Sequence, residues 1–439
     1  MLNDTHDPAL RSWLPSANDP DTDFPIQNLP FGIFHQPDRE EPRVGVAIGD
    51  QIVDVAAGVG LGVFSGAALE AAHACEGPTL NPLMAVAPAQ VSALRAELSR
   101  LLREDGPPEE RRSRISDAML VPMSDCELLV PAAIGDYTDF YASIHHATNV
   151  GGMFRPDNPL LPNYKHLPIG YHGRASSIVA SGTAVRRPSG QTYDETAATV
   201  SVGPSRALDY ELELGAFVGR GNRLGEPVAL ADAWDHIFGF CLVNDWSARD
   251  IQRWEYQPLG PFLAKSFATT VSPWVVTTEA LLPHRVKPAE RPPEDPPLQP
   301  YLDTPDDRER GALDITLEVL LATAAMREKG VEPVRLSRGG FATMYWTMAQ
   351  MLAHHTSNGC NLRPGDLLAS GTVSGRAKDS RGCLLELTWR GSEPIELPNG
   401  ETRKFLDDGD EVIIRGWAGG INGPRIGFGE CRGTVAPAT

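Results

Sequence analysis

Acidic side chains occur in three short runs of the chain. Glu211 and Glu213 alternate with leucines, so an extended strand would point both carboxylates from one face. This alternation alone is more typical of a strand with one face in solvent. Asp245 ends an apolar run, and Asp139 lies on a predicted loop among Asp, Tyr and Thr. Four carboxylates from three segments would suit Mg²⁺ or Ca²⁺, and the sequence lacks the Cys and His spacings typical of zinc sites.

Groups suited to proton transfer and anion binding occur near these runs. His146 is the natural general base beside a cation-bound substrate, because imidazole titrates near neutrality. Its neighbour His145 is expected only to pack or to form hydrogen bonds. Lys265 stands in a mostly apolar segment, which indicates that it donates into a site. Arg249 and Gln252 follow the second acidic run at helical spacing and could share its side. Four more side chains could hold a carboxylate: Tyr141, Arg155, Tyr171 and Tyr256.

Longer motifs around these residues resemble the fumarylacetoacetate hydrolase family. The likeness runs in order from about residue 131 to residue 428 and extends more weakly into the N-terminal part. Such motifs are far more specific than two alternating glutamates, and they match the full-length, two-domain enzyme type. They occupy residues 135–141, 146–151, 167–177, 244–252, 258–262 and 361–372.

The resemblance implies an activity and a role for each motif residue. The activity is hydrolysis of the carbon–carbon bond of 4-fumarylacetoacetate to fumarate and acetoacetate, the last step of tyrosine and phenylalanine degradation. The implied ligands of Ca²⁺ and/or Mg²⁺ are Asp139, Glu211, Glu213 and Asp245, with Lys265 and Thr269 near a further cation site. The implied catalytic residues are the base His146, its orienting partner Glu386, and the oxyanion-binding Arg249, Gln252 and Lys265. The implied substrate-binding residues are Tyr141, Arg155, Tyr171, Gln252, Tyr256 and Thr372.

Two departures from the family pattern stand near the site. Ala268 occupies a position, beside Thr269, where family members carry Gly, and an added methyl group could alter the approach of a cation or substrate. Residues 376–381 also differ in character. Two other functions stay open: an acylpyruvate hydrolase or another β-keto acid enzyme of the same superfamily, and a catalytically idle binding scaffold. The presence of every ligand and of the base argues against the scaffold.

Composition limits the partners. The 439 residues carry a formal net charge of −18, which disfavours nucleic acid and anionic lipid. No apolar run is long enough for a membrane helix, and no secretory signal is evident. Six scattered cysteines are typical of reduced thiols, so we expect a cytoplasmic protein. The expected partners are the small-molecule substrate and, from the resemblance, a second copy in a homodimer.

The element pattern predicts a β-rich, mixed α+β protein. Strands are expected at 31–34, 43–48 and 51–54, and helices at 88–102, 230–238 and 341–354. Residues 1–30 are expected to form a loose arm. We divide the chain into an N-terminal domain (1–130) with a structural or dimer-supporting role and a C-terminal catalytic domain (131–439). The resemblance implies a small SH3-like β-barrel for the first and a large mixed β-sandwich roll for the second.

Overall fold

Short apolar strands separated by turn residues build the first part of the molecule. In the computed structural model, which describes residues 2–420 and 423–439, Gly49 has φ 55° in the turn that joins β2 to β3. The predicted strands and the helix at 88–102 are confirmed. The elements are β1 (Phe31–His35), β2 (Arg43–Ile48), β3 (Gln51–Asp54), α1 (Val55–Gly60), α2 (Gly66–His73), α3 (Asn81–Met84), α4 (Pro88–Leu102), α5 (Glu109–Met119), β4 (Leu120–Pro122) and β5 (Glu127–Leu129).

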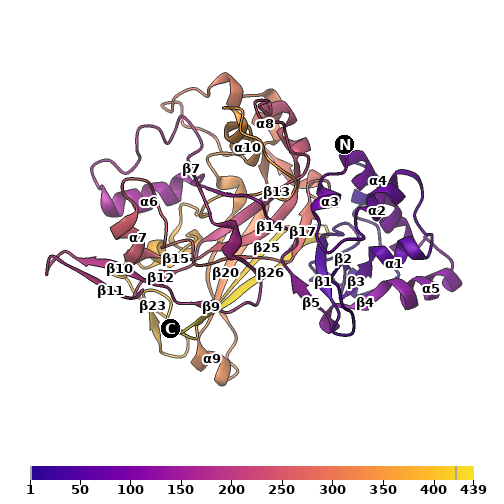
Figure 1. Ribbon diagram of the computed structural model, residues 1–439, viewed down its shortest axis with the longest axis horizontal. Helices are drawn as coiled ribbons and strands as arrows, with labels where there is room; N and C mark the ends of the chain where they lie inside the picture. The colour runs from indigo at the N-terminus through magenta and orange to yellow at the C-terminus, as the bar shows by residue number, and fades with distance from the viewer. Residues whose placement is uncertain (1, 421–422) are drawn as a thin grey trace.

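One large sheet crosses from this part into the rest of the chain. Its order is β4-β3-β2-β1-β17-β14-β13-β22-β6-β7, and β1 pairs with β17 through Phe31 and Gly32 (Figure 1). Strands β5, β8 and β16 pair at its sides. The strands beyond residue 131 are β6 (Tyr137–Phe140), β7 (Gly170–His172), β8 (Ile178–Ala180), β13 (Leu212–Val218), β14 (Ile237–Asp245), β16 (Thr269–Val271), β17 (Trp274–Thr277) and β22 (Leu367–Ala369).

A second sheet packs against one face of the first. Its order is β21-β20-β25-β26-β9, and its leucines and isoleucines share one apolar cluster with Leu214 of β13 and Leu242 of β14. The prediction of a β-rich protein with a large sandwich-like part is confirmed, whereas the SH3-like barrel stays a prediction. The strands are β9 (Val185–Arg186), β20 (Ile315–Ala322), β21 (Val334–Gly340), β25 (Glu411–Gly419) and β26 (Arg425–Ala436).

The opposite face of the large sheet is covered by the N-terminal part. Phe217 of β13 and Val243 of β14 lie in a second apolar cluster with Val46, Leu94 and Leu98. Because side chains alternate along a strand, Glu211 and Glu213 project toward the same side as Phe217. Both faces of β13 are therefore covered, so the alternation of Glu211 and Glu213 does not mark a solvent-facing side, and both residues are buried as a ligand role requires.

Helices and two-stranded hairpins surround the sheets. The hairpin of β10 (Ser189–Asp194) and β11 (Thr199–Pro204) projects from the molecule on the side that carries α6 and α7 (Figure 1). Three small pairs are β12 (Leu208–Asp209) with β15 (Ser247–Ala248), β18 (Arg285–Val286) with β19 (Ala312–Leu313), and β23 (Ile395–Glu396) with β24 (Thr402–Arg403). The helices are α6 (Ile144–Phe154), α7 (Arg249–Glu255), α8 (Pro305–Arg310), α9 (Ala324–Glu328), α10 (Met348–Thr356) and α11 (Leu384–Leu387).

Two predicted helices differ from the structure. The helix at 230–238 is a 3-10 helix over Leu230–His236, and the chain then enters β14 because its apolar run pairs with β13. The helix at 341–354 begins as a 3-10 turn, and α10 starts later because Thr347 forms a capping box with Gln350.

Residues 2–30 are fastened to the rest of the protein rather than loose, so the expected arm is wrong. The buried guanidinium of Arg95 donates to the carbonyl oxygens of Gln27 and Asn28. Asn28 Nδ2 in turn donates to the carbonyl oxygen of Gly427 in β26 at 2.8 Å. Asp23 pairs with Arg425 of the same strand at 2.7 Å. The beginning of the chain is thus fastened to its last strand.

Candidate active site

Adjacent strands bring the four predicted carboxylates together. Asp245 ends β14, Glu213 lies in β13 with Glu211 just before it, and Asp139 lies in β6. The order β14-β13-β22-β6 sets these strands at one part of the large sheet. One oxygen from each carboxylate lies within 4.8 Å of the others, and all four side chains are buried.

This cluster holds more negative charge than its surroundings compensate. Burial, followed by the charges of Asp139 and Asp245, raises the pKa of Glu213 well above its ordinary value. Burial and the charge of Asp245 likewise raise the pKa of Asp139. Both carboxylate oxygens of Glu213 are buried without a hydrogen-bond partner. Buried carboxylates with unused oxygens fit a divalent, oxygen-seeking cation such as Mg²⁺ or Ca²⁺, because such an ion would satisfy both charge and lone pairs.

Two buried cations stand beside the carboxylates. Lys265 Nζ donates to Glu211 and, at 2.8 Å, to Asp245 Oδ2. Although burial opposes its charge, the carboxylates of Asp245 and Glu211 raise the pKa of Lys265, so the ammonium group persists. Arg249 donates to Glu211 at 2.7 Å and to Asp209 at 2.9 Å. Burial alone would raise the pKa of Glu211, but Lys265 and Arg249 together lower it.

Hydrogen bonds hold the remaining groups around this cluster. Asp245 accepts from Thr269 Oγ1 at 2.6 Å and from Tyr171 Oη at 2.7 Å. Gln252 Oε1 accepts a hydrogen bond from Arg249 Nη1 at 3.2 Å, so the amide nitrogen of Gln252 points away from Arg249. Ala268 is buried beside Thr269.

A histidine–glutamate pair forms the second part of the site. His146 Nδ1 lies 2.6 Å from Glu386 Oε2, and both side chains are buried. Glu386 also accepts from Asn149 at 2.8 Å and from Ser374 at 2.7 Å. Burial would raise the pKa of Glu386, but its pairing with His146 and these hydrogen bonds lower it to about 2. An ionised Glu386 only accepts, so His146 carries its proton on Nδ1 and leaves Nε2 free to take one.

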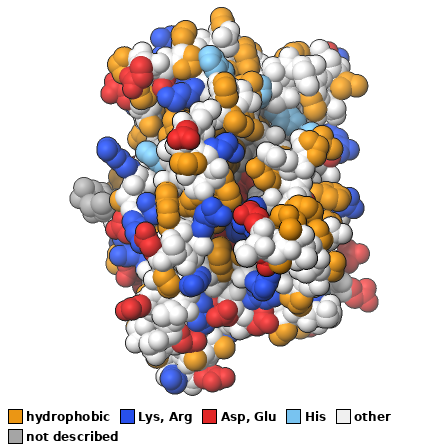
Figure 2. Space-filling view, turned by 90° about the vertical axis from the view of Figure 1, so that its left-hand side faces the viewer, with side chains coloured by type: hydrophobic (Ala, Val, Ile, Leu, Met, Phe, Trp, Pro, Cys, Tyr) orange, Lys and Arg blue, Asp and Glu red, His pale blue; other side chains and the backbone are white. Residues whose placement is uncertain are grey.

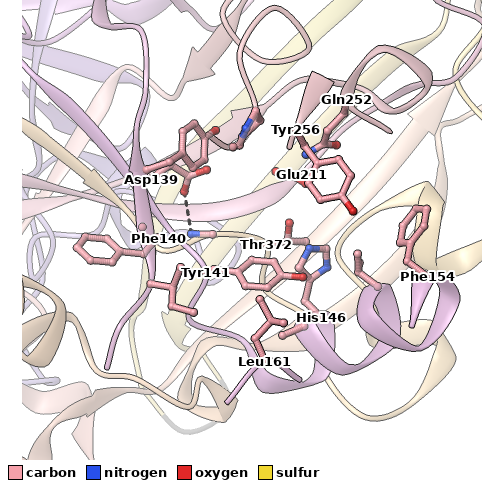
Figure 3. Close-up of a pocket in the computed structure, with 18 of the residues that line it drawn as sticks. Asp139, Phe140, Tyr141, His146, Phe154, Leu161, Glu211, Gln252, Tyr256 and Thr372 are labelled. Atoms are coloured by element: carbon pink, nitrogen blue, oxygen red, sulfur yellow. Dashed lines mark hydrogen bonds between the residues drawn. The ribbon is translucent and has the colours of Figure 1, made fainter. Parts of the chain in front are cut away.

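Both parts meet at one cavity of about 460 Å³. Figure 3 shows Tyr141, His146 and Thr372 lying together, with Glu211, Gln252 and Tyr256 across the space. The ring of Tyr141 packs edge-on against that of His146, with 5.2 Å between centroids. The predicted residues that line the cavity are Asp139, Tyr141, His146, Arg155, Tyr171, Glu211, Arg249, Gln252, Tyr256, Lys265 and Thr372.

The other predicted residues lie just behind the wall of the cavity. Glu213, Asp245 and Thr269 are buried in the carboxylate cluster, and Glu386 is buried behind His146. His145, expected to be only structural, does not line the cavity and is about half-buried. The structure therefore groups every residue that the sequence singled out, while their individual roles remain predictions.

Sequence reasoning missed the groups that hold the functional side chains. Asp209 lies against Arg249, and Asn149, Ser374 and Cys383 surround the carboxylate of Glu386. Asn149 could have been found, because it stands three residues after His146 on one helix and so shares its face. Nothing in the local sequence of Ser374 or Cys383 indicates this contact.

Comparison with known proteins identifies the family. A family description, fumarylacetoacetate (FAA) hydrolase C-terminal, matches residues 137–436, and another, fumarylacetoacetase N-terminal, matches residues 27–131. The chain belongs to the fumarylacetoacetate hydrolase family. Among the family's curated members, fumarylacetoacetase from Bos taurus is 49% identical over 431 residues, which cover 97% of this chain and 99% of that protein. Fumarylacetoacetase from Caenorhabditis elegans is 52% identical and covers 95% and 97%, respectively.

A solved structure supports the family fold alone. The crystal structure of a protein described as HpcE from Mycobacterium smegmatis has 20% sequence identity and a TM-score of 0.52. The matched region covers 93% of this chain and 99% of the Mycobacterium smegmatis chain. Within the part of the chain that the structure describes, none of the helices has the length and apolar character needed to cross a membrane.

Proposed function

We propose that this enzyme hydrolyses the carbon–carbon bond of 4-fumarylacetoacetate and releases fumarate and acetoacetate. The observation that carries the proposal is the cavity onto which both the carboxylate cluster and the His146–Glu386 pair open. Near 50% identity to fumarylacetoacetases over almost the whole chain supports the same substrate.

Ca²⁺ and/or Mg²⁺ is the proposed cofactor. Asp139, Glu211, Glu213 and Asp245 would hold it, and Lys265 and Thr269 lie where the family resemblance implies a further cation. When bound, such a cation supplies Lewis acidity toward the β-diketone oxygens and the enolate that leaves. The two partnerless oxygens of Glu213 support this assignment.

The side chains around the cavity then divide the remaining chemistry. His146 Nε2 takes a proton from water, whose oxygen attacks the carbonyl carbon of the fumaryl group. Arg249, Lys265 and the amide of Gln252 stabilise the oxyanion. The bond between the fumaryl carbonyl carbon and the acetoacetate carbon then breaks, and its electron pair forms the enolate of acetoacetate. The proton held by His146 is finally transferred to this acetoacetate carbon. Loss of one oxyanion donor commonly costs about 3 kcal/mol of transition-state stabilisation.

Two lines of support concern the rest of the molecule. We place the boundary between an N-terminal domain (1–130) and a catalytic domain (131–439), because the site residues all follow residue 131 while the N-terminal part covers one sheet face.

Six unpaired cysteines support a cytoplasmic location.

A homodimer is the proposed assembly. Val202 of the projecting hairpin and Leu259 and Phe262 near the cavity mouth are exposed, by 76%, 96% and 68%, which suits contact with a second copy. Light scattering across a dilution series is the check. A mass of twice 47.5 kDa supports the dimer, and 47.5 kDa at every concentration contradicts it.

The deciding experiment follows the absorbance of fumarylacetoacetate with and without a chelator. We expect loss of absorbance that yields fumarate and acetoacetate and that stops when the cation is removed. No loss with the cation bound would overturn the proposal. Turnover of acylpyruvates instead would then identify a related hydrolase, and failure on those substrates as well would indicate a binding scaffold.

A further inference from the structure

Four basic side chains line the cavity among the residues that the structure describes: Arg155, Arg249, Arg253 and Lys265. Two of them are partly engaged within the protein. Arg249 and Lys265 each contact two buried carboxylates, although Nη2 of Arg249 is buried without a hydrogen-bond partner. Arg155 and Arg253 have no such buried carboxylate partner. The Nε atom of Arg155 is buried without a hydrogen bond, and its Nη2 atom reaches only the carbonyl oxygen of Pro159, at 3.4 Å.

Arg253 lies at the cavity mouth on α7, directly after Gln252. Its salt-bridge partner is Glu195, at 3.6 Å, and that carboxylate is 73% exposed, while the neighbouring Asp194, also at the surface, interacts with the Arg253 charge. An exposed pair at this separation is weak, because water screens it. Figure 2 looks onto this side of the molecule, where basic side chains gather around a hollow. They do so although the chain as a whole carries a net charge of −18.

The projecting hairpin holds Arg253 in place. Arg253 Nη2 donates to the carbonyl oxygen of Tyr193 at 3.3 Å. The next residue, Trp254, stacks on the Tyr193 ring with 4.8 Å between centroids. Strand β10 therefore orients a guanidinium that keeps most of its donors free.

Fumarylacetoacetate has a carboxylate at each end, and the forked donors of a guanidinium suit either one. We propose that Arg253 binds the terminal carboxylate that is not held by Arg155, a residue that the family resemblance already implies in substrate binding. This inference rests on the proposed function and adds a second anion subsite to it. It also gives the hairpin a task, since β10 supplies the carbonyl group that orients Arg253.

The test compares three substrates. Fumarylacetoacetate carries both carboxylates, acetylacetoacetate lacks that of the fumaryl end, and fumarylacetone lacks that of the acetoacetate end. For Arg253→Gln we expect KM for fumarylacetoacetate to rise about 10- to 100-fold, the usual range for a lost charge-assisted hydrogen bond, with kcat within about threefold of the parent. The effect should disappear with one of the shorter substrates, and the effect of Arg155→Gln with the other. Arg253→Lys should recover part of the loss.

Several outcomes overturn the inference. The inference is wrong if Arg253→Gln leaves KM unchanged, or if it raises KM equally for all three substrates. Glu195→Gln is the control for a merely structural role, and its KM should equal or fall below that of the parent. A rise as large as that of Arg253→Gln would show that Arg253 only anchors the hairpin. If the parent enzyme shows no turnover, the proposed function is wrong and this inference falls with it. If the parent is active but Arg253→Gln leaves KM unchanged, only this inference is wrong.

Discussion

At the scale of single residues, neighbouring histidines offer a matched pair of substitutions. His146 faces the cavity and contacts Glu386, whereas His145 does not line the cavity. We expect His146→Phe to lower kcat by roughly 10³-fold, within the range for loss of a general base, while a substrate analogue still binds. His145→Phe should keep near-parental kcat. Stopped-flow turnover and calorimetric binding measure both, and near-normal kcat in His146→Phe would remove the base assignment.

Glu213 should show opposite effects on stability and cation binding. Its two unpartnered oxygens and raised pKa mean that its ionised form is unfavourable without a cation. In a chelator, Glu213→Gln should therefore raise Tm, by about 2 °C, while elemental analysis finds less bound cation. Asp245→Ala should also lose the cation, yet lower Tm, because Asp245 accepts hydrogen bonds from Tyr171, Lys265 and Thr269. Unchanged metal content in both variants would exclude this site.

Residue types near the site could be predicted from sequence, but most of their hydrogen-bond partners could not. The motif segments contain His146, Asp139 and Asp245, whereas the roles of Glu211, Glu213 and Glu386 were implied by the family resemblance outside those segments. Contacts such as Ser374 to Glu386 or Asp209 to Arg249 depend on how distant segments meet. The alternation of Glu211 and Glu213 alone could not show their burial for the same reason, since burial of both sheet faces is a tertiary property.

At the scale of elements, the start of α8 carries a pH-dependent contact. Asp307 lies in the first turn of α8 and accepts from Thr347, which caps α10. Burial raises the pKa of Asp307 to about 6, with the Thr347 hydrogen bond acting against it. Because the folded state binds this proton more tightly than the unfolded state, stability decreases as pH rises from about 4 to about 6.

The corresponding variant is Asp307→Asn. A shift of roughly two pKa units corresponds to a contribution of at most about 3 kcal/mol. Asn keeps the acceptor for Thr347 but has no charge, so we expect its unfolding free energy to exceed that of the parent above pH 6 and to vary less between pH 4 and 6. Urea unfolding across this range measures it, and identical pH slopes for the two proteins would contradict the assignment.

Elements were predictable where the local pattern is strong. The strands at 31–35 and 43–48 and the helix at 88–102 follow from apolar spacing and turn residues. The helix at 341–354 was misplaced because Thr347 caps a later start. The 3-10 segment at Leu230–His236 ends early because the next residues gain more by pairing in β14 than by extending a helix.

At the scale of the whole molecule, one sheet and one shared apolar cluster join the two parts. Strand β1 pairs with β17, and side chains of β13 and β14 pack against the N-terminal helices. We expect one calorimetric unfolding transition for the full chain. We also expect residues 131–439 alone to aggregate or bind a hydrophobic dye, because removal of residues 1–130 uncovers a sheet face. Two separated transitions, or a stable and active fragment, would contradict this coupling.

The bonds from Asp23 and Asn28 to the last strand bear on synthesis at the ribosome. The first 30 residues leave the ribosome long before β26 exists, and His146 precedes its partner Glu386 by 240 residues. During synthesis, the early segments of the chain therefore lack their contacts with the last strand until translation is nearly complete. Contacts this distant in sequence also slow folding. Truncation by even the final strand should thus yield a product for degradation rather than an enzyme of reduced activity.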